Sequence, residues 1–171
     1  MLTKEYLTRK KYSIIKSPQI DCTNTSSLIN DFQKFKSCKD TQLTYQIRGK
    51  PFWEACQMII STTGLHKSEI IEYTAIDKRT LNRMLDPNRK GTTRKETLIS
   101  FCLGLKLDYD LSIELLHCHG TDISGPNDEI YRYLLRYTHS AKEDDDETDI
   151  SIYDCNHILL ENGYPKLTKN G

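Results

Sequence analysis

Two short apolar repeats, separated by a very short connection, constrain the fold more than any other feature of the chain. Residues 68–86 have the sequence SEIIEYTAIDKRTLNRMLD. Inward-facing residue types recur at helical spacing in both halves, at Ile70, Ile71 and Thr74 and then at Leu81, Met84 and Leu85. Ser68 and Asp77 precede these repeats, and both residue types are favourable N-caps. The sequence therefore predicts two short helices whose connection, TAID, turns the second helix away from the first.

The polar face of the second predicted helix consists of residues that donate hydrogen bonds. It contains Lys78, Arg79, Asn82 and Arg83 and no acidic residue. From Lys78 to Lys95 the chain has seven basic residues and one acidic residue, although its formal net charge is zero. A basic patch binds phosphate whatever charge the rest of the chain carries. Charged helix faces are also commonly only solvated, so the pattern alone leaves both a nucleic-acid interface and an ordinary surface open.

Helical spacing of apolar residues continues on both sides of this pair, and no segment shows the alternation of a strand, so the predicted fold class is all-α. Residues 51–64 form one predicted helix, a capping box from Thr93 to Glu96 opens another, and Asp108 opens a fifth over 108–120. The predicted core of this five-helix unit, residues 51–120, contains Phe52, Cys56, Ile70, Leu81, Leu98, Phe101, Leu111 and Leu115.

The segments on either side of this unit differ in charge. Residues 1–50 hold ten Lys/Arg against four Asp/Glu and are predicted to be partly disordered or to form one short helix. Residues 121–171 hold five against eleven and form a helical extension. Its first helix begins near Glu129 with Ile130, Leu134 and Tyr137 inward, and its last packs Ile152, Cys155 and Leu159. The acidic segment 141–149 between them is expected to be a solvated linker, with a metal-binding or DNA-mimicking role left open.

Five helices in this order, with a short and tightly joined second and third, resemble the helix-turn-helix domain of Cro/repressor-type regulators, the xenobiotic-response-element family. The resemblance covers roughly residues 51–120. The positions where that family places inward residues are Ile70, Thr74, Ile76, Leu81 and Met84. Residues 88–110, NRKGTTRKETLISFCLGLKLDYD, look like the family's loop, fourth helix and entry to the fifth. LLHCHG, a further helix and the terminal ISIYDCNHILLENG resemble a longer bacterial variant.

The resemblance implies a lambda-repressor-like bundle that regulates transcription by binding double-stranded DNA. Helix 78–85 would enter the major groove, where Arg suits guanine and Asn suits adenine. Groove contacts would come from Lys78, Arg79, Asn82 and Arg83. Phosphate contacts would come from Lys67, Ser68, Arg89, Lys90, Arg94 and Lys95. A homodimer and a protein partner on the C-terminal extension stay open as further assemblies.

Two residues differ from the family's pattern and motivate a rival hypothesis. Ala75 stands where the hinge usually has Gly, and Ala can adopt a left-handed turn at a cost of about 1 kcal/mol. Ile71 replaces a small residue, and its branched side chain is expected to widen the angle between the two helices. Together with the neutral total charge and the acidic C-terminal third, Ile71 favours a protein-interaction module, such as a phage-type inhibitor or an antitoxin-like partner.

Catalysis, cofactors, metals and membranes are not expected. The chain has no glycine-rich phosphate loop, H-E-x-x-H or G-x-S-x-G motif. Its six cysteines include no C-x-x-C pair and are expected to stay reduced, several as small core residues. Adjacent His117, Cys118 and His119 cannot easily share one metal on a helix, and the histidines are expected to cap its end. No apolar run approaches the roughly 20 residues of a membrane span, and the N-terminus lacks a secretory signal, so a cytoplasmic location is expected.

Overall fold

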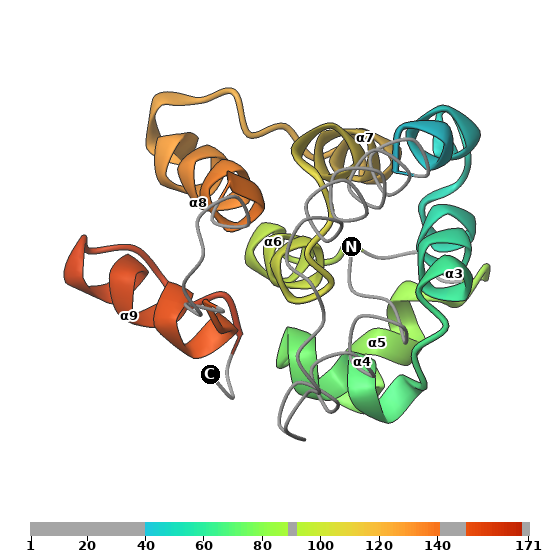
Figure 1. Cartoon of the computed structure of the whole chain (residues 1–171), viewed down its shortest axis with the longest axis horizontal. Coiled ribbons are helices and arrows are strands. Elements are labelled where there is room, and N and C mark those ends of the chain that lie inside the picture. Colours follow the sequence, from blue (N-terminus) through green and yellow to red (C-terminus); the bar gives the residue numbers. More distant parts are fainter. Residues whose placement is uncertain (1–39, 89–91, 141–149, 169–171) are drawn as a thin grey trace, which may run out of the picture.

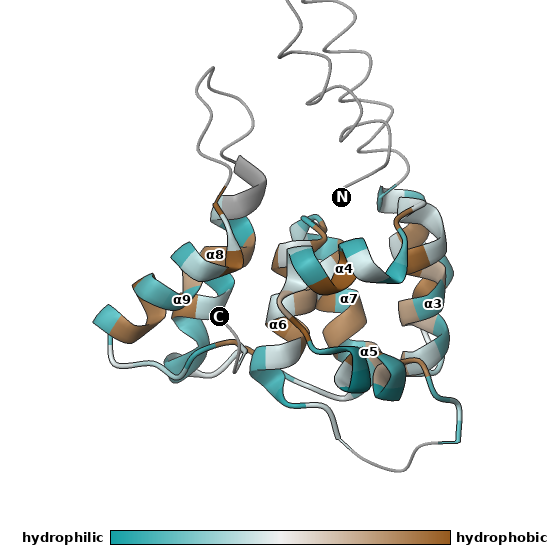
Figure 2. Ribbon diagram, turned by 90° about the horizontal axis from the view of Figure 1, so that it is seen from below, coloured by the Kyte–Doolittle hydropathy of each residue, from teal (hydrophilic) through white to brown (hydrophobic). Residues whose placement is uncertain are grey.

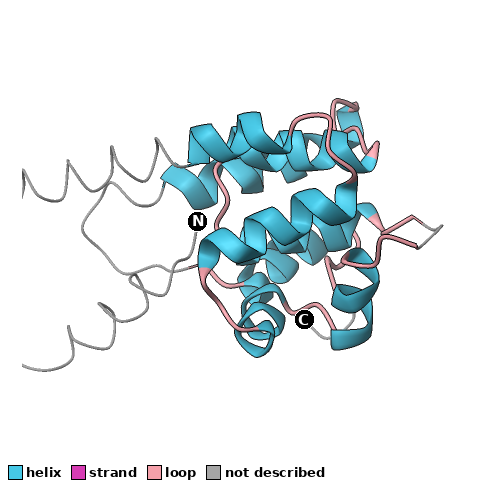
Figure 3. Cartoon of the chain, turned by 90° about the vertical axis from the view of Figure 1, so that its right-hand side faces the viewer, coloured by secondary structure: helices cyan, strands magenta, loops and turns pink. Residues whose placement is uncertain are grey.

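The computed structural model of the chain describes residues 40–88, 92–140 and 150–168. Every regular element in these ranges is helical and none is a strand, which confirms the all-α class (Figure 3). Helical residues 40–47 precede α3 (Phe52–Thr63), α4 (Lys67–Thr74), α5 (Lys78–Met84), α6 (Lys95–Gly104), α7 (Tyr109–His119), the 3-10 turn η1 (Pro126–Asp128), α8 (Glu129–Ser140) and α9 (Ile152–Glu161). The predicted N-terminal arm up to residue 39 and the acidic linker 141–149 lie outside the described residues.

Aspartate N-caps and glycine C-caps define several helix ends as the sequence predicted. The Asp77 side chain accepts a hydrogen bond from the backbone N–H of Thr80 at 2.9 Å and opens α5. Asp108 opens α7 in the same way. Gly64 and Gly120 end α3 and α7 with left-handed φ angles of 67° and 78°. Glycine adopts this conformation without a steric penalty from Cβ, which is why these two helices stop where the sequence indicated.

Two predicted helix starts are wrong. Helix α4 has His66 as its N-cap, and the His66 backbone N–H donates to Glu69 Oε2 at 2.7 Å, so Ser68 lies inside the first turn. Helix α6 has Arg94 as its N-cap, so the capping box expected from Thr93 is not formed. The Thr93 N–H instead donates to His119 Nε2, 3.1 Å away. At α6, a partner other than the expected Glu96 therefore satisfies the Thr93 backbone donor.

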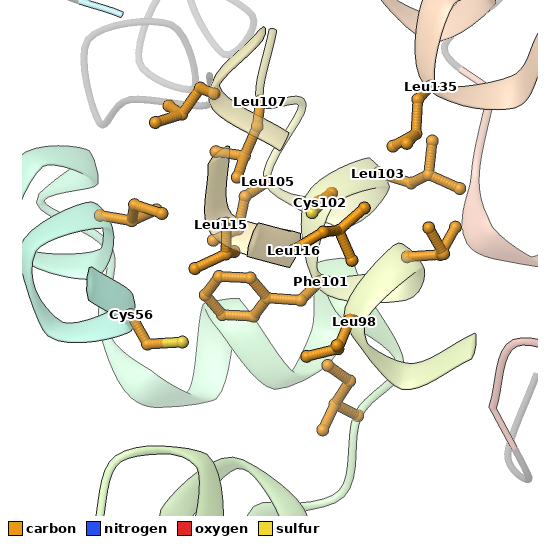
Figure 4. Close-up of a cluster of buried hydrophobic side chains, with 14 of the residues drawn as sticks. Cys56, Leu98, Phe101, Cys102, Leu103, Leu105, Leu107, Leu115, Leu116 and Leu135 are labelled. Atoms are coloured by element: carbon orange, nitrogen blue, oxygen red, sulfur yellow. The ribbon is translucent and has the colours of Figure 1, made fainter. Parts of the chain in front are cut away.

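Helix α6 occupies the centre of the molecule (Figure 1). Helices α4, α7, α8 and α9 all pack against it, and α3 packs against α7 and α5. The buried apolar side chains form one cluster that runs from Leu43 in the first helical segment to Leu167 near the C-terminus. Figure 4 shows Phe101, Cys102 and Leu115 among the side chains of this cluster. The C-terminal extension therefore docks on the central helices, as expected.

The predicted core is largely confirmed. Seven of its eight residues are buried, and Phe52 is half-buried with its ring edge-on to His119, the ring centroids being 4.7 Å apart. The predicted inner face of α8 is wrong in one position, because Tyr137 is exposed. Leu134 is buried as predicted, and the helix also buries Tyr131 and Leu135, since it packs against both α6 and α7.

The described cysteines behave as small core residues. Cys56, Cys102 and Cys155 are buried free thiols, and burial raises the pKa of each. Cys118 is half-buried, and its thiol donates to the backbone oxygen of Ile47. In the described part of the chain, no helix is both long and apolar enough to span a membrane.

Candidate nucleic-acid interface

The connection between α4 and α5 is fixed by α6. The Ser100 hydroxyl of α6 donates to the Thr74 carbonyl oxygen at 2.6 Å, at the last residue of α4. Ala75 follows in the left-handed conformation, with φ 50° and ψ 21°, as predicted for this position. Ile76 is then buried, which anchors the connection to the core just before Asp77 opens α5. The Ser100 hydrogen bond, the buried Ile76 and the Asp77 cap together fix the start of α5.

The close approach in this region is between α4 and α6. A Cβ added to Gly104 would lie 2.5 Å from the Tyr73 carbonyl oxygen and 2.6 Å from the Thr74 Cα. Only a residue without a side chain allows α6 to pass this near to the end of α4. Ile71 is half-buried and packs against the core cluster. The effect expected of Ile71 on the angle between α4 and α5 stays a prediction.

One face of α5 is buried and the opposite face is basic. Leu81 and Met84 are buried, whereas the four residues predicted to face the DNA groove are all exposed: Lys78, Arg79, Asn82 and Arg83. These four side chains line one surface hollow together with Asp86. In Figure 2, α5 is coloured largely as hydrophilic and lies at the lower edge of the helical body. The structure thus brings the four predicted groove residues to one accessible surface.

The acidic residue at the start of α5 is engaged within the helix. Asp77 accepts hydrogen bonds from both the N–H and the hydroxyl of Thr80. The hydrogen bonds from Thr80 hold the pKa of the Asp77 carboxyl below its usual value. Asp77 is therefore ionised at neutral pH, where it favours the N-terminal end of α5 through the helix dipole.

The described residues that are predicted to contact phosphate fall into three groups. Lys67 and Ser68 are exposed at the start of α4, and Lys67 Nζ lies 3.4 Å from Asn82 Oδ1 on α5. Arg94 is exposed and forms an ion pair with Glu96 at 3.3 Å. Lys95 is partly buried and pairs with the buried Asp128 at 2.6 Å, so its ammonium group stabilises the fold.

The remaining two predicted phosphate contacts, Arg89 and Lys90, lie outside the described residues. The three basic residues among the described phosphate contacts therefore differ in availability. Arg94 is exposed beside α5, Lys67 contacts a predicted base-reading residue, and Lys95 is engaged by the C-terminal extension.

A second cavity lies next to the basic face of α5. Its volume is about 420 Å³, and its walls come from the connection before α5, the segment before α6 and residues 167 and 168 near the C-terminus. Arg79, Arg83 and Arg94 all line it. No local sequence pattern indicates this cavity, because the C-terminal residues that line it are more than seventy positions away from Arg94.

His119 has a structural role at the edge of this region. Its Nε2 accepts the Thr93 N–H, and its Nδ1 lies 2.7 Å from the Thr121 hydroxyl. Burial lowers the pKa of His119, which favours the neutral ring that this acceptor role needs. Among the residues that the structure describes, no group of three or more His, Cys, Asp or Glu side chains is arranged to hold a metal ion.

Comparisons with known proteins give no match to this chain among protein-family models, curated proteins or solved structures.

Proposed function

We propose that this chain is a sequence-specific, double-stranded DNA-binding regulator of the lambda-repressor-like, helix-turn-helix type. The observation that carries the proposal is the exposed face of α5, where Lys78, Arg79, Asn82 and Arg83 stand together opposite the buried Leu81 and Met84. All four side chains donate hydrogen bonds, and Asn82 also accepts them. A rigid helix that presents such side chains from one face suits direct readout of base edges.

The helical form of α5 agrees with insertion into the major groove. An α-helix with its side chains is about 10–12 Å in diameter, and the groove is about 12 Å wide. Helix α4 precedes α5 in the sequence. The first residues of α4, Lys67 and Ser68, are exposed. In a helix-turn-helix arrangement the first helix crosses the phosphate backbone while the second enters the groove. We therefore assign the start of α4 to the backbone and the face of α5 to the bases.

Each proposed contact follows from the chemistry of its side chain. Arg79 and Arg83 can each donate two parallel hydrogen bonds to guanine, and the Asn82 carboxamide can pair with adenine. Lys67 lies against the Asn82 oxygen and would orient that carboxamide as well as neutralise phosphate. Arg94 is the proposed phosphate contact at the start of α6. Arg89 and Lys90 remain proposed phosphate contacts, as expected from the sequence. Lys95 is excluded because Asp128 already holds it.

The test begins with selection from a randomised duplex library, because the operator is not specified by the residues. Fluorescence anisotropy of the selected duplex is then measured at several salt concentrations. Arg79→Ala and Asn82→Ala should each weaken binding to the selected duplex by about 1–3 kcal/mol and relax preference at one or two base pairs. Arg48→Ala is the matched control, because Arg48 is also exposed, does not line either hollow beside α5, and pairs with Glu114 of α7.

The outcome is decided by the comparison between these variants. Loss of affinity in the α5 variants with retention in Arg48→Ala supports base reading by α5. If no duplex is retained at low salt, or if Arg79→Ala and Asn82→Ala bind as the parent does, the proposal is wrong. Circular dichroism of each variant ensures that a loss of binding is not a loss of folding.

A second candidate function is protein binding through the C-terminal extension. Tyr133 on α8 and Tyr153 on α9 are 57% and 60% exposed, and Tyr133 stacks on the exposed Tyr137 with ring centroids 5.6 Å apart. Exposed aromatic side chains are typical of interfaces with other proteins. Analytical ultracentrifugation tests whether a second copy is the partner. A parent chain that self-associates and a Tyr133→Ser variant that stays monomeric would support this function.

A further inference from the structure

The second cavity is a feature that the proposed DNA-binding function does not explain, although Arg79, Arg83 and Arg94 in its lining are proposed DNA contacts. It lies between the connection before α5, the segment that leads into α6, and the C-terminal residues 167 and 168. We propose that this cavity binds the phosphate group of a small phosphorylated metabolite, and that the bound phosphate withdraws Arg79 and Arg83 from DNA. The competition with DNA rests on the proposed DNA-binding function, whereas phosphate binding in the cavity does not.

Three guanidinium groups make the cavity an anion site. Arg79 and Arg83 line it from α5, and Arg94 lines it from the N-cap of α6. Within the described part of the chain, neither Arg79 nor Arg83 is in an ion pair, and Arg94 keeps 60% of its side chain exposed while pairing with Glu96. Asp77 is the one acidic residue in the lining, and Thr80 already donates to both of its carboxylate oxygens. Arginine forks match the oxygens of a phosphate group in pairs, which favours phosphate over a spherical halide ion.

Neutral donors complete the lining. Threonine hydroxyls line the wall on the α6 side, at Thr92, Thr93 and Thr97. Arg94 is the N-cap of α6 and gives no side-chain hydrogen bond to the helix, so the first-turn N–H groups of this ten-residue helix lack a side-chain acceptor. Such groups carry partial positive charge and add to the attraction that the arginines exert on an anion.

The C-terminal segment forms one wall of the cavity. Leu167 is buried, and its N–H donates to the Asn156 side-chain oxygen of α9 at 2.8 Å, which fixes this wall. The neighbouring Thr168 also lines the cavity. A volume of about 420 Å³ lies within the range of small-molecule pockets, which is roughly 300–1,000 Å³. A wall contributed by a separate element partly surrounds a small ligand, whereas a duplex presents its phosphates along an open surface.

Two arginines belong to both surfaces. Arg79 and Arg83 line the cavity and also the hollow on the DNA-facing side of α5. A guanidinium that is paired with a phosphate in the cavity cannot at the same time donate its fork to a guanine. An occupied cavity therefore lowers the affinity for DNA without any change in the fold, and DNA binding lowers the affinity for the phosphate to the same extent.

Binding is tested first in the absence of DNA, with the full chain and with inorganic phosphate and glycerol 3-phosphate as probes. Amide chemical shifts are followed by NMR at constant ionic strength, with chloride as the replacement ion. We expect saturable shifts at Thr93, Thr97 and Arg94 with both probes, and about tenfold weaker binding in Arg94→Gln, which loses one charged contact. Arg48→Gln is the matched control, because Arg48 has the same 60% exposure and the same 3.3 Å ion pair, made to Glu114. Three results would each overturn the phosphate site. Chloride could cause the same shifts, Arg94→Gln could bind the probes as tightly as the parent, or glycerol 3-phosphate could cause no shifts.

Competition is tested second, by titrating glycerol 3-phosphate into the protein–DNA complex at constant ionic strength. Release of DNA by glycerol 3-phosphate, but not by the same ionic strength of chloride, supports the coupling. A protein that binds glycerol 3-phosphate and holds DNA with undiminished affinity overturns the coupling and leaves the phosphate site standing. A protein that binds glycerol 3-phosphate but no DNA sequence at all refutes the DNA-binding function and the coupling with it, and again leaves the phosphate site standing.

Discussion

Replacing Gly104 with Ala tests how α6 fixes the base of the α4–α5 pair. The added methyl group would stand 2.5 Å from the Tyr73 carbonyl oxygen, 2.6 Å from the Thr74 Cα and 2.8 Å from the Thr74 Cγ2. Two of these three atoms belong to the backbone, which cannot rotate away as a flexible side chain does. Helix α6 or the end of α4 must therefore shift by several tenths of an ångström to accept the methyl group.

The expected loss of stability is the difference between two opposing effects. An added methylene-sized group in a well-packed core costs about 1–3 kcal/mol, and contact with backbone atoms at these distances places Gly104→Ala near the upper limit. Alanine is the better helix former, which offsets about 1 kcal/mol. The free energy of unfolding should therefore fall by about 2 kcal/mol. An exposed helical glycine would show the opposite sign, so the sign itself is informative.

The measurement is urea denaturation followed by far-UV circular dichroism, with Gly64→Ala as the control. Nothing lies within 4 Å of a Cβ at Gly64, so that variant loses only the cost of a left-handed alanine, about 1 kcal/mol. The slope of unfolding free energy against urea should be unchanged in both variants. A Gly104→Ala variant as stable as the parent, or more stable, would refute the close packing of α6 on α4.

Three further substitutions separate local from tertiary effects. Ala75→Gly should raise the free energy of unfolding by somewhat less than about 1 kcal/mol, because it relieves a left-handed alanine but removes a half-buried methyl group. Lys95→Ala should lower it by about 1–3 kcal/mol, since the buried Asp128 loses its partner, and should leave the salt dependence of DNA binding unchanged. Burial lowers the pKa of His119 in the folded chain, so the unfolded chain takes up the proton first. The free energy of unfolding should therefore fall as pH drops below about 6.5. His119→Gln should remove this part of the pH dependence in thermal melts.

The sequence predicted the elements whose signals are local. Apolar spacing located the helices and seven of the eight core residues, because inward residues must repeat with the period of the helix. Asp77 and Asp108 were found as N-caps because each side chain reaches a donor three residues ahead. Helix starts that depend on other partners were missed: His119 accepts the Thr93 N–H from twenty-six positions away.

The candidate site also combines features that local sequence signals predict with features that depend on contacts between distant residues. The four exposed residues of α5 follow from the helical period alone, since Leu81 and Met84 define the buried face opposite them. The pairing of Lys95 with Asp128 does not follow, because it depends on how η1 and α8 return to α6. One wall of the cavity beside α5 is formed by the C-terminal segment through Asn156 of α9, a contact between elements that no local pattern indicates.

The number of Lys and Arg side chains available to contact phosphate sets the salt dependence that DNA binding should show. The sequence offered five cationic phosphate contacts, Lys67, Arg89, Lys90, Arg94 and Lys95. Five contacts would give a slope of log K against log salt of about −4.5 per protomer, at about −0.9 for each. With Lys95 held by Asp128, four contacts remain and the slope should be about −3.6. Anisotropy titrations across a range of salt concentrations distinguish the two values. A slope near −4.5 in the parent that becomes shallower in Lys95→Ala would mean that Lys95 leaves Asp128 on binding, which would refute its assignment to the fold.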